Sequence, residues 1–399
     1  MRLLIFNCGS SSLKFELLEL GGSARRTLAR GKIEEIGPHA QAAITIGDRS
    51  STPAIAAADH ASAALHVLDA LRPLIERQPP DVVVHRIVHG GAQITRPALA
   101  DAAVMRSLEE ASRFAPLHNP PALATLRAVS ARLAGVSTVV VPDTAFHHTL
   151  PEYARTYAIP RELARRHGIR RFGFHGVGHA WMARRYAEIS RTPAAQLKLI
   201  TLQLGSGCSA CAISRGHSVD TSMGLTPLEG LMMRTRSGDL DPAIIGYLMR
   251  ADHISVDEVE HILNSQSGLA GIARRSDVRE LEAATDDADA ALALTMFSYR
   301  VRKYIGAYLA VLGGADAIIF GGGIGEHSSA VRARICGGLE ALGIILDPAR
   351  NRAADGHEAP ISTDASPVKL YVIPLDEELY MAQAAMRLLA PPQTSQSYS

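Results

Sequence analysis

The stretch LLIFNCGSSSLKFELL, residues 3–18, indicates how this chain begins to fold. An apolar run over residues 3–7 leads into a turn of small residues, and a second apolar run follows to residue 18. This pattern is typical of two β-strands joined by a tight connection. It returns as LITLQLGSGCSACAI at residues 199–213. Two strand, turn and strand cycles in one chain predict two similar lobes.

Helical patterns and β-branched runs fill the rest of the chain. Apolar residues at helical spacing alternate with short runs rich in Val and Ile, which predicts an α/β protein. The expected helices are residues 56–75, a helix from Pro120 to Gly135, residues 289–312 and a last one from near Asp376, and the expected strands are residues 81–88, 137–141 and 317–320.

The expected architecture is two similar lobes that face an active-site cleft. A length of 399 residues fits two or three domains of ordinary size. The first lobe is expected to span residues 1–147 and to be completed by residues 380–399. The second lobe is expected to span residues 148–379.

Composition argues against several classes of protein. With 41 Lys and Arg against 40 Asp and Glu, the formal net charge is +1, which offers no field to attract nucleic acid or an anionic membrane. Hydrophobic residues make up 47% of the chain, too many for a disordered protein. Four cysteines are too few for a disulfide framework, and no apolar stretch reaches the roughly 18 residues of a membrane span. We therefore expect a cytoplasmic protein with neither nucleic acid nor membrane as its partner.

Three loops of small residues each follow an apolar strand, at residues 8–12, 205–209 and 321–325. Without a Cβ in the way, backbone N–H groups in such loops approach a phosphate closely. No Gly-Lys pair in the chain is followed by Ser or Thr, so there is no Walker motif. Glu326 stands where a Rossmann fingerprint requires a small residue. Each loop alone also fits an ordinary tight turn, and nucleotide binding rests on the three together.

Six motifs lie along the chain: NCGSSSLKF (7–15), HRIVHGG (85–91), DTAFH (143–147), RFGFHG (171–176), DTSMGLTPLEG (220–230) and TRSGD (235–239). Together they resemble the acetate kinase family, whose two-lobed α/β fold is shared with sugar kinases, actin and heat-shock chaperones. The resemblance runs nearly from end to end. It implies reversible, Mg²⁺-dependent transfer of the γ-phosphoryl group of ATP to acetate, which forms acetyl phosphate and ADP. It also implies a homodimer.

The resemblance assigns ATP or ADP to the three loops and their neighbours. Small residues, hydroxyl groups and a lysine are the groups that suit phosphate oxygens at these positions. The implied cofactor-binding residues are Asn7, Ser10, Ser12, Lys14, Gly205, Ser206, Gly207, Gly322, Gly323, Ile324 and Gly325.

Phosphoryl transfer to a carboxylate brings two anions together, so cations and positioning matter more than covalent chemistry. Arg86 and Arg236 each offer a planar fork of donors, and the resemblance places both beside the substrate and the transferring group. His175 resembles the family histidine that donates a hydrogen bond to that group. Asp143 completes the implied catalytic set. Taken alone, each arginine also fits a surface salt bridge.

The implied metal ligands are Asn7, Asp143 and Glu377. Mg²⁺ prefers oxygen ligands of this kind and usually keeps several waters. Without the resemblance, Asp143 also fits a turn residue, and Glu377 fits a first-turn carboxylate favoured by the helix dipole.

An acyl pocket is implied by the resemblance at Val88, Leu117, Phe174 and Pro227. Apolar residues such as these equally fit a structural core. One methylene group is worth only about 1 to 3 kcal/mol of discrimination, so propionate or butyrate remains an alternative acceptor.

Four positions depart from the family pattern. Gln203 and Ser206 stand where the second phosphate loop usually has His and Asn, and Ala122 and His327 each replace an Asn. The shorter serine side chain and the uncharged glutamine are expected to weaken donor binding. A phosphoryl donor other than ATP therefore stays open.

Two other classes of protein compete with the enzyme. A non-enzymatic, actin-like nucleotide-binding protein would share the fold, but Arg86, Arg236 and His175 argue against it. A nucleic-acid binder would need a basic patch with interleaved aromatic residues. The five arginines between residues 161 and 171 form a basic patch without such aromatic residues. A solvated helix face or a subunit contact is the favoured interpretation of Arg161, Arg165, Arg166, Arg170 and Arg171.

Overall fold

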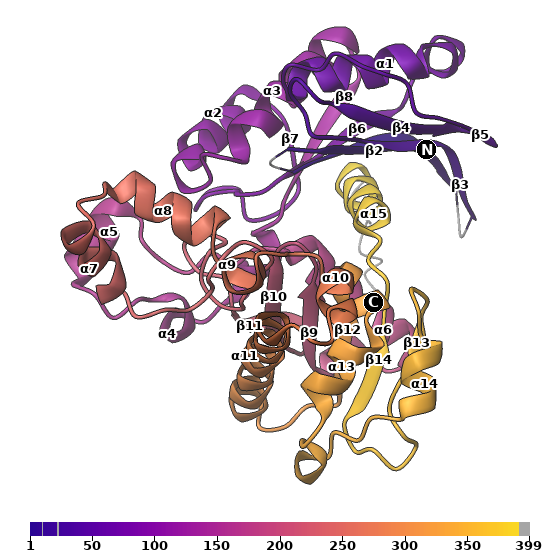
Figure 1. Cartoon of the computed structure of the whole chain (residues 1–399). Coiled ribbons are helices and arrows are strands. Elements are labelled where there is room, and N and C mark those ends of the chain that lie inside the picture. The colour runs from indigo at the N-terminus through magenta and orange to yellow at the C-terminus, as the bar shows by residue number, and fades with distance from the viewer. Residues whose placement is uncertain (10, 22–23, 391–399) are drawn as a thin grey trace, which may run out of the picture. The chain divides into compact units, whose positions relative to one another are not determined.

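The structure is a computed structural model that describes residues 1–9, 11–21 and 24–390. It divides into two compact units (Figure 1), the first formed by Met1–Ala145 with Asp376–Ser399 and the second by Phe146–Leu375. The first boundary follows Ala145 rather than residue 147, and the second precedes Asp376 rather than residue 380. Glu377 therefore belongs to the first unit.

An eight-stranded sheet forms the centre of the first unit, in the order β5-β4-β3-β2-β1-β6-β8-β7. β1 (Arg2–Cys8) pairs antiparallel with β2 (Leu13–Gly21) and parallel with β6 (Val82–Ile87), which pairs parallel with β8 (Ser137–Pro142). Every residue of β1 is buried, as expected of a central strand covered on both faces. The remaining strands are β3 (Ala24–Glu34), β4 (Gln41–Ile46), β5 (Arg49–Ser51) and β7 (Ala98–Leu99).

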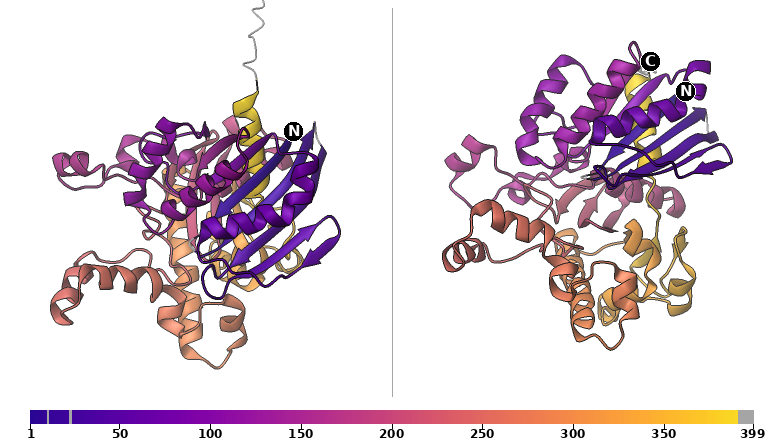
Figure 2. Two further views of the ribbon diagram at one scale, coloured as in Figure 1. Left: turned by 90° about the horizontal axis from the view of Figure 1, so that it is seen from above. Right: turned by 45° about the horizontal axis from the view of Figure 1, so that its top comes forward.

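Helices cover both faces of this sheet. α1 (His60–Arg77) and α3 (Asn119–Arg132) pack on one face, and α15 (Glu377–Leu389) packs on the other, against β1, β6 and β8 (Figure 1). Both views in Figure 2 show α15, in yellow, against the indigo strands. α2 (Ala102–Ala111) and a 3₁₀ turn at Ser112–Phe114 pack beside α3. The last helix of the chain thereby completes the first unit.

The helix expected from residue 56 begins at His60. Asp59 accepts a hydrogen bond from the Ser62 amide at 2.7 Å, and the Ser62 hydroxyl lies 3.1 Å from the Asp59 amide that donates to it, so the two form a capping box. Ala57 instead forms a β-bridge with Gly37. Ala57 is therefore held in extended backbone, which the apolar spacing of this segment did not indicate.

A six-stranded sheet forms the centre of the second unit, in the order β11-β10-β9-β12-β14-β13. β9 (Lys198–Leu204) pairs antiparallel with β10 (Cys208–Ser214) and parallel with β12 (Ala317–Gly321). These pairings repeat those of β1 with β2 and β6, so the prediction of an α/β chain with two similar units is confirmed. The remaining strands are β11 (His217–Thr221), β13 (Ala359–Pro360) and β14 (Lys369–Val372).

Two long helices pack on this second sheet. α6 (Gly176–Ser190) packs on β9 and β12, and α11 (Ala288–Leu312) packs on β10 and β9. α11 ends at Gly313, whose φ of 63° is the left-handed conformation that a helix C-terminus favours. The shorter helices are α4 (Glu152–Arg155), α5 (Arg161–His167), α7 (Ala243–Ala251), α8 (Val256–Ser265), α9 (Gly268–Ala273), α10 (Val278–Ala283), α12 (Gly322–His327), α13 (Ser329–Cys336) and α14 (Pro348–Ala353), and 3₁₀ turns lie at Ala145–Thr149, Ala194–Gln196 and Glu340–Leu342.

All four cysteines are free and buried. Burial raises the pKa of the Cys208 thiol to about 12 and places that of Cys211 still higher. The C-x-x-C pair thus consists of two buried neutral thiols in β10. No helix among the described residues is long and apolar enough to cross a membrane.

Candidate active site

Three polar residues gather where parallel strands of the first unit end. Asn7 lies in β1, Arg86 in β6, and Asp143 directly after β8. The carboxyl ends of neighbouring parallel strands meet at one edge of a sheet, which is where ligands bind in open α/β sheets. Arg86 Nη2 donates to Asp143 Oδ2 at 2.7 Å, and its Nη1 donates to Asn7 Oδ1 at 3.2 Å.

The first turn of α15 adds two carboxylates to this cluster. Asn7 Nδ2 donates to Glu377 Oε2 at 2.8 Å and to Glu378 Oε1 at 3.3 Å. Burial and the neighbouring charge of Glu377 raise the pKa of Glu378. Burial alone would lower the pKa of Arg86, but the charges of Asp143 and Glu377 outweigh it and raise that pKa. The arginine thus faces more negative charge than it carries.

This excess of carboxylate oxygen fits a divalent cation. Glu377 and Glu378 are half-buried and repel each other, and a cation between them and Asn7 would relieve that repulsion. The donor set of carboxylate and amide oxygens is the kind that Mg²⁺ prefers. Within the described residues, no group of three or more His, Cys, Asp and Glu side chains is arranged to hold a metal ion.

Gly9 and Ser12, from the first small-residue loop, lie between β1 and β2 and contact each other. The Gly9 amide donates to the Ser12 carbonyl at 2.8 Å, and a Cβ at position 9 would lie 2.6 Å from Ser12 Oγ. Lys14 is exposed at the start of β2, and its charge acts on Glu378. Ser10 lies outside the described residues.

The residues expected around the acyl chain divide between the two units. In the first unit Val88 is buried, whereas Leu117 is 64% exposed. In the second unit Phe174 is buried and Pro227 is half-buried. The exposure of Leu117 shows that this side chain does not belong to the core of its own unit.

The second unit contains a hollow of about 650 Å³, a volume typical of small-molecule sites. Gly205, Ser206, Gly323 and Ile324, all expected to bind nucleotide, line it. Of the other lining residues, the sequence drew attention to His327 alone, as a departure from the family pattern. The remaining ones lie outside the small-residue loops and were not identified: Arg234, Ser276, Asp277, Val278, Arg279, Glu282, Ser328 and Asp355.

The third small-residue loop follows β12, as expected, and continues directly into helix α12. Gly322 has a φ of 75°, and a Cβ there would lie 2.7 Å from the Leu204 carbonyl oxygen, so glycine is required. Glu326 accepts hydrogen bonds from the amides of Gly322 at 2.8 Å and Leu375 at 3.1 Å. The residue that argued against a Rossmann fingerprint therefore holds this turn in place.

His327 and Asp355 meet at the edge of the hollow. The Nδ1 atom of His327 lies 2.8 Å from Asp355 Oδ1, and the ring packs over Gly356. The imidazole therefore stands where the family pattern has an amide, with a carboxylate beside it.

The buried Arg332 fixes α12 from behind. It donates to the carbonyls of Gly325 and Glu326 at 2.8 Å each and to Asn351 Oδ1 at 2.7 Å. These bonds satisfy carbonyls near the end of the helix.

His175 and Arg236 meet at the second loop. A Cβ at position 207 would lie 3.2 Å from Cε1 and Nε2 of His175 and 3.6 Å from Nη1 of Arg236. Gly207 therefore leaves room for both side chains. His175 has a φ of 57° just before α6, a left-handed conformation that costs a non-glycine residue about 1 to 3 kcal/mol and recurs at functional sites.

Arg236 is a half-buried cation without an ion pair among the described residues. Its Nη1 atom donates to the Pro227 carbonyl at 3.1 Å, and burial lowers its pKa. A guanidinium held in this way is electrostatically undercompensated, which suits it to an incoming anion.

Comparison with known proteins identifies a family for this chain. The sequence model of the acetokinase family matches residues 2–383. The chain belongs to the acetokinase family. It is 43% identical over 389 residues to an acetate kinase of Clavibacter sepedonicus, an alignment that covers 96% of this chain and 98% of that protein. Among solved structures, an acetate kinase of Porphyromonas gingivalis gives a TM-score of 0.91 at 37% identity, covering 98% of this chain and 100% of that one. A propionate kinase of Francisella tularensis gives 0.90 at 35%, covering 96% and 98%.

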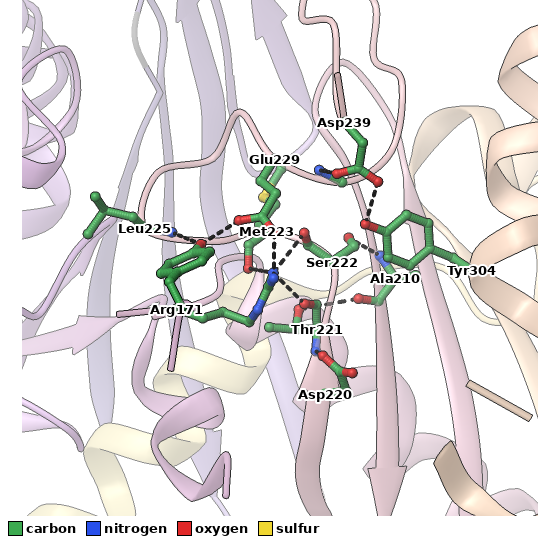
Figure 3. A network of polar contacts seen from close by, with 12 residues as sticks. Arg171, Ala210, Asp220, Thr221, Ser222, Met223, Leu225, Glu229, Asp239 and Tyr304 are labelled. Atoms are coloured by element: carbon green, nitrogen blue, oxygen red, sulfur yellow. Dashed lines mark hydrogen bonds and ion pairs between the residues drawn. The ribbon is translucent and has the colours of Figure 1, made fainter. Parts of the chain in front are cut away.

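The motif DTSMGLTPLEG, residues 220–230, surrounds the guanidinium of Arg171 (Figure 3). Arg171 Nη1 donates to the carbonyls of Thr221 at 3.0 Å and of Ser222 and Met223 at 3.1 Å, and Nη2 pairs with Glu229. The loop that presents the Pro227 carbonyl to Arg236 is thereby fixed. Arg171, one of the five arginines considered for nucleic acid, points into the fold.

Proposed function

We propose that the protein transfers the γ-phosphoryl group of ATP to acetate, in a reversible, Mg²⁺-dependent reaction that forms acetyl phosphate and ADP. One observation carries the proposal: His175 and Arg236 converge on Gly207 in a small-residue loop, next to a hollow of about 650 Å³. A cation without an ion pair and a ring donor at this place suit a transferring phosphoryl group. Membership of the acetokinase family supports the same reaction.

Each unit contributes separate roles to the proposed reaction. In the second unit, the hollow binds the nucleotide, and Arg236 and His175 stabilise the charge that develops on the phosphoryl oxygens. In the first unit, Arg86 orients the acceptor carboxylate, and Asp143 keeps the guanidinium fork in place. Val88, Leu117, Phe174 and Pro227 are the proposed contacts of the alkyl group.

The proposed Mg²⁺ would be held by Asn7, Asp143 and Glu377 in the first unit. When bound, it neutralises negative charge on the phosphate oxygens. The hydrogen bonds from Asn7 to Glu377 and from Arg86 to Asp143 orient the carboxylates before the metal arrives.

Acyl phosphate trapping tests this function. The purified protein is incubated with Mg²⁺, hydroxylamine and formate, acetate, propionate or butyrate, with ATP or pyrophosphate as donor. We expect acyl hydroxamate with acetate and ATP. The similarity to a propionate kinase structure makes propionate the alternative acceptor, favoured if its kcat/KM exceeds that of acetate. No hydroxamate with any acid and donor would overturn the proposal.

Restoring the family amide in the second loop is expected to raise the use of ATP. Ser206 is exposed in the hollow, and its hydroxyl is shorter than an asparagine amide. A hydrogen bond to a charged group contributes about 1.5 to 3 kcal/mol, so Ser206→Asn should raise kcat/KM for ATP about 10- to 100-fold. Steady-state kinetics at varied ATP measure this change. An unchanged or lower value would mean that the loop has adapted to serine.

We also propose a cytoplasmic homodimer. The four free, buried cysteines support a reducing compartment. Helix α7 buries none of its residues, and its Ile244 and Tyr247 are 42% and 64% exposed, which suits a subunit contact. Light scattering at the elution peak is expected to give twice the chain mass of 42.6 kDa.

A further inference from the structure

A line of hydrogen bonds leads through the second unit to His175. Thr201 Oγ1, on β9, lies 2.7 Å from Nδ1 of His179, on α6. Nε2 of His179 lies 2.7 Å from Ser209 Oγ, on β10, and the same oxygen lies 2.8 Å from Nδ1 of His175. Thr201, His179 and Ser209 are all 0% exposed. No solvent therefore competes for these groups.

The direction of each bond follows from counting donors. Within the described residues, the ring of His179 is the one partner of the Thr201 hydroxyl. A buried hydroxyl left without an acceptor costs about 1 to 3 kcal/mol, so Thr201 donates to Nδ1 of His179. Burial lowers the pKa of His179 well below its usual value, and the nearby rings of His147 and His175 act in the same direction. The ring is neutral and carries its proton on Nε2.

The remaining two bonds are then determined. Nε2–H of His179 donates to Ser209 Oγ, which leaves the serine hydrogen for the other ring within reach. Ser209 therefore donates to Nδ1 of His175. If Nδ1 of His175 carried a proton instead, both this N–H and Nε2–H of His179 would donate to Ser209 Oγ. The serine hydrogen would then have no acceptor among the described residues.

We propose that Thr201, His179 and Ser209 are positioning residues that hold His175 in the tautomer with its proton on Nε2. This atom lies beside Gly207 and Arg236, so its N–H is the donor directed at the phosphate loop. The inference rests on the role of His175 in the proposed phosphoryl transfer. It explains why a strand threonine and a second, fully buried histidine lie behind the site.

His147 supports the same histidine through the backbone. Its Nε2 donates to the Phe174 carbonyl at 3.0 Å, and its Nδ1 lies 2.8 Å from the Ser218 hydroxyl. The peptide preceding His175 is thereby held while the residue adopts its left-handed conformation.

Ring-¹⁵N histidine labelling tests the tautomer directly in the wild-type protein. Long-range ¹H–¹⁵N correlation spectra distinguish a protonated from an unprotonated ring nitrogen, and the spectrum of His175→Gln assigns the signals. We expect a protonated Nε2 and an unprotonated Nδ1 for both His175 and His179 at neutral pH. A neutral His175 with its proton on Nδ1, or a doubly protonated ring, would overturn the proposal.

Kinetics of variants test the function of the chain of bonds. Thr201→Val removes the first donor and is expected to lower kcat about 3- to 10-fold with KM for ATP within about 2-fold, because only one net hydrogen bond is lost. Thr201→Ser should restore kcat. Ser209→Ala removes two bonds and should lower kcat about 10- to 100-fold.

The matched control is Thr125→Val, in α3 of the first unit. Thr125 is also 0% exposed and donates to the His60 carbonyl at 3.2 Å, so this variant loses a comparable buried bond. Its histidine ring signals should match the wild type. Equal losses of kcat in Thr125→Val and Thr201→Val, with unchanged His175 signals in both, would contradict the positioning role.

Failure of this inference is separable from failure of the proposed function. The tautomer is read without turnover, whereas acyl hydroxamate is measured without reference to the tautomer. If acyl hydroxamate forms but His175 carries its proton on Nδ1, the positioning role is wrong and the proposed reaction stands. If His175 carries its proton on Nε2 but no acyl hydroxamate forms, the hydrogen bonds from Thr201, His179 and Ser209 are as proposed and the proposed reaction is wrong.

Discussion

Arg236→Ala is expected to lower kcat about 10²- to 10³-fold while the protein stays folded. A preorganised donor aimed at developing charge is worth about 3 to 4 kcal/mol, and each 1.36 kcal/mol is a factor of ten in rate. The wild-type guanidinium has no ion pair among the described residues, so its removal strands no buried carboxylate. The loss should therefore fall on catalysis more than on stability. Steady-state kinetics and thermal unfolding of the same preparation measure both.

Two variants sharpen this experiment. Arg236→Lys keeps the charge but loses the planar fork, and it should recover part of the lost rate. Arg185→Ala serves as the control, because Arg185 makes surface ion pairs with Glu188 and Glu358 in the same unit. A folded Arg236→Ala protein with nearly normal kcat would make Arg236 structural.

Removal of Arg86 should act on stability as well as on activity. The Arg86 and Asp143 side chains are 12% and 1% exposed, so their ion pair is buried. Breaking a buried pair by removing one partner costs about 3 to 5 kcal/mol, because the other charge is left uncompensated. Arg86→Leu should lower the free energy of unfolding by this amount and abolish measurable acetate phosphorylation. Urea unfolding measures the first effect.

The double variant Arg86→Leu/Asp143→Leu distinguishes pairing from simple loss of packing. Replacing both charges by apolar groups removes the stranded carboxylate, so part of the lost stability should return while activity stays absent. Equal or greater destabilisation in the double variant would mean that the ion pair is not the source of the effect.

The main strands could be predicted from sequence because their apolar runs are continuous. Residues 3–7 and 13–18 were expected as strands, and β1 and β2 contain them. β3 (Ala24–Glu34) gave no such signal, since among its eleven residues Ala29 and Ile33 are the buried ones. A strand exposed along most of its length carries little hydrophobic periodicity. β3 forms because it pairs with β2, and no local sequence signal indicates that pairing.

Some of the site residues could also be predicted from sequence, and others could not. Asn7, Arg86 and Asp143 were identified because they lie in motifs that resemble the acetate kinase family, and the structure brings them together through hydrogen bonds. Thr201 and Ser209 were not identified, because a hydroxyl in an apolar strand or in a loop of small residues carries no signal of its own. Their significance comes from α6, which places His179 between Thr201 on β9 and Ser209 on β10. Asp277 was not identified from the sequence either; in the structure it caps α10 and lines the hollow.

The proposed reaction moves a phosphoryl group from ATP to a short carboxylate. ³¹P NMR of the purified protein with ATP, Mg²⁺ and acetate measures that transfer in one tube, because the acyl phosphate, ADP and inorganic phosphate give separate signals. We expect acyl phosphate and ADP to appear in equal amounts and at the same rate, and to disappear from the Arg236→Ala sample. ADP accompanied by inorganic phosphate alone, or an unchanged ATP spectrum with every short-chain acid, would show that the protein does not transfer the phosphoryl group to a carboxylate.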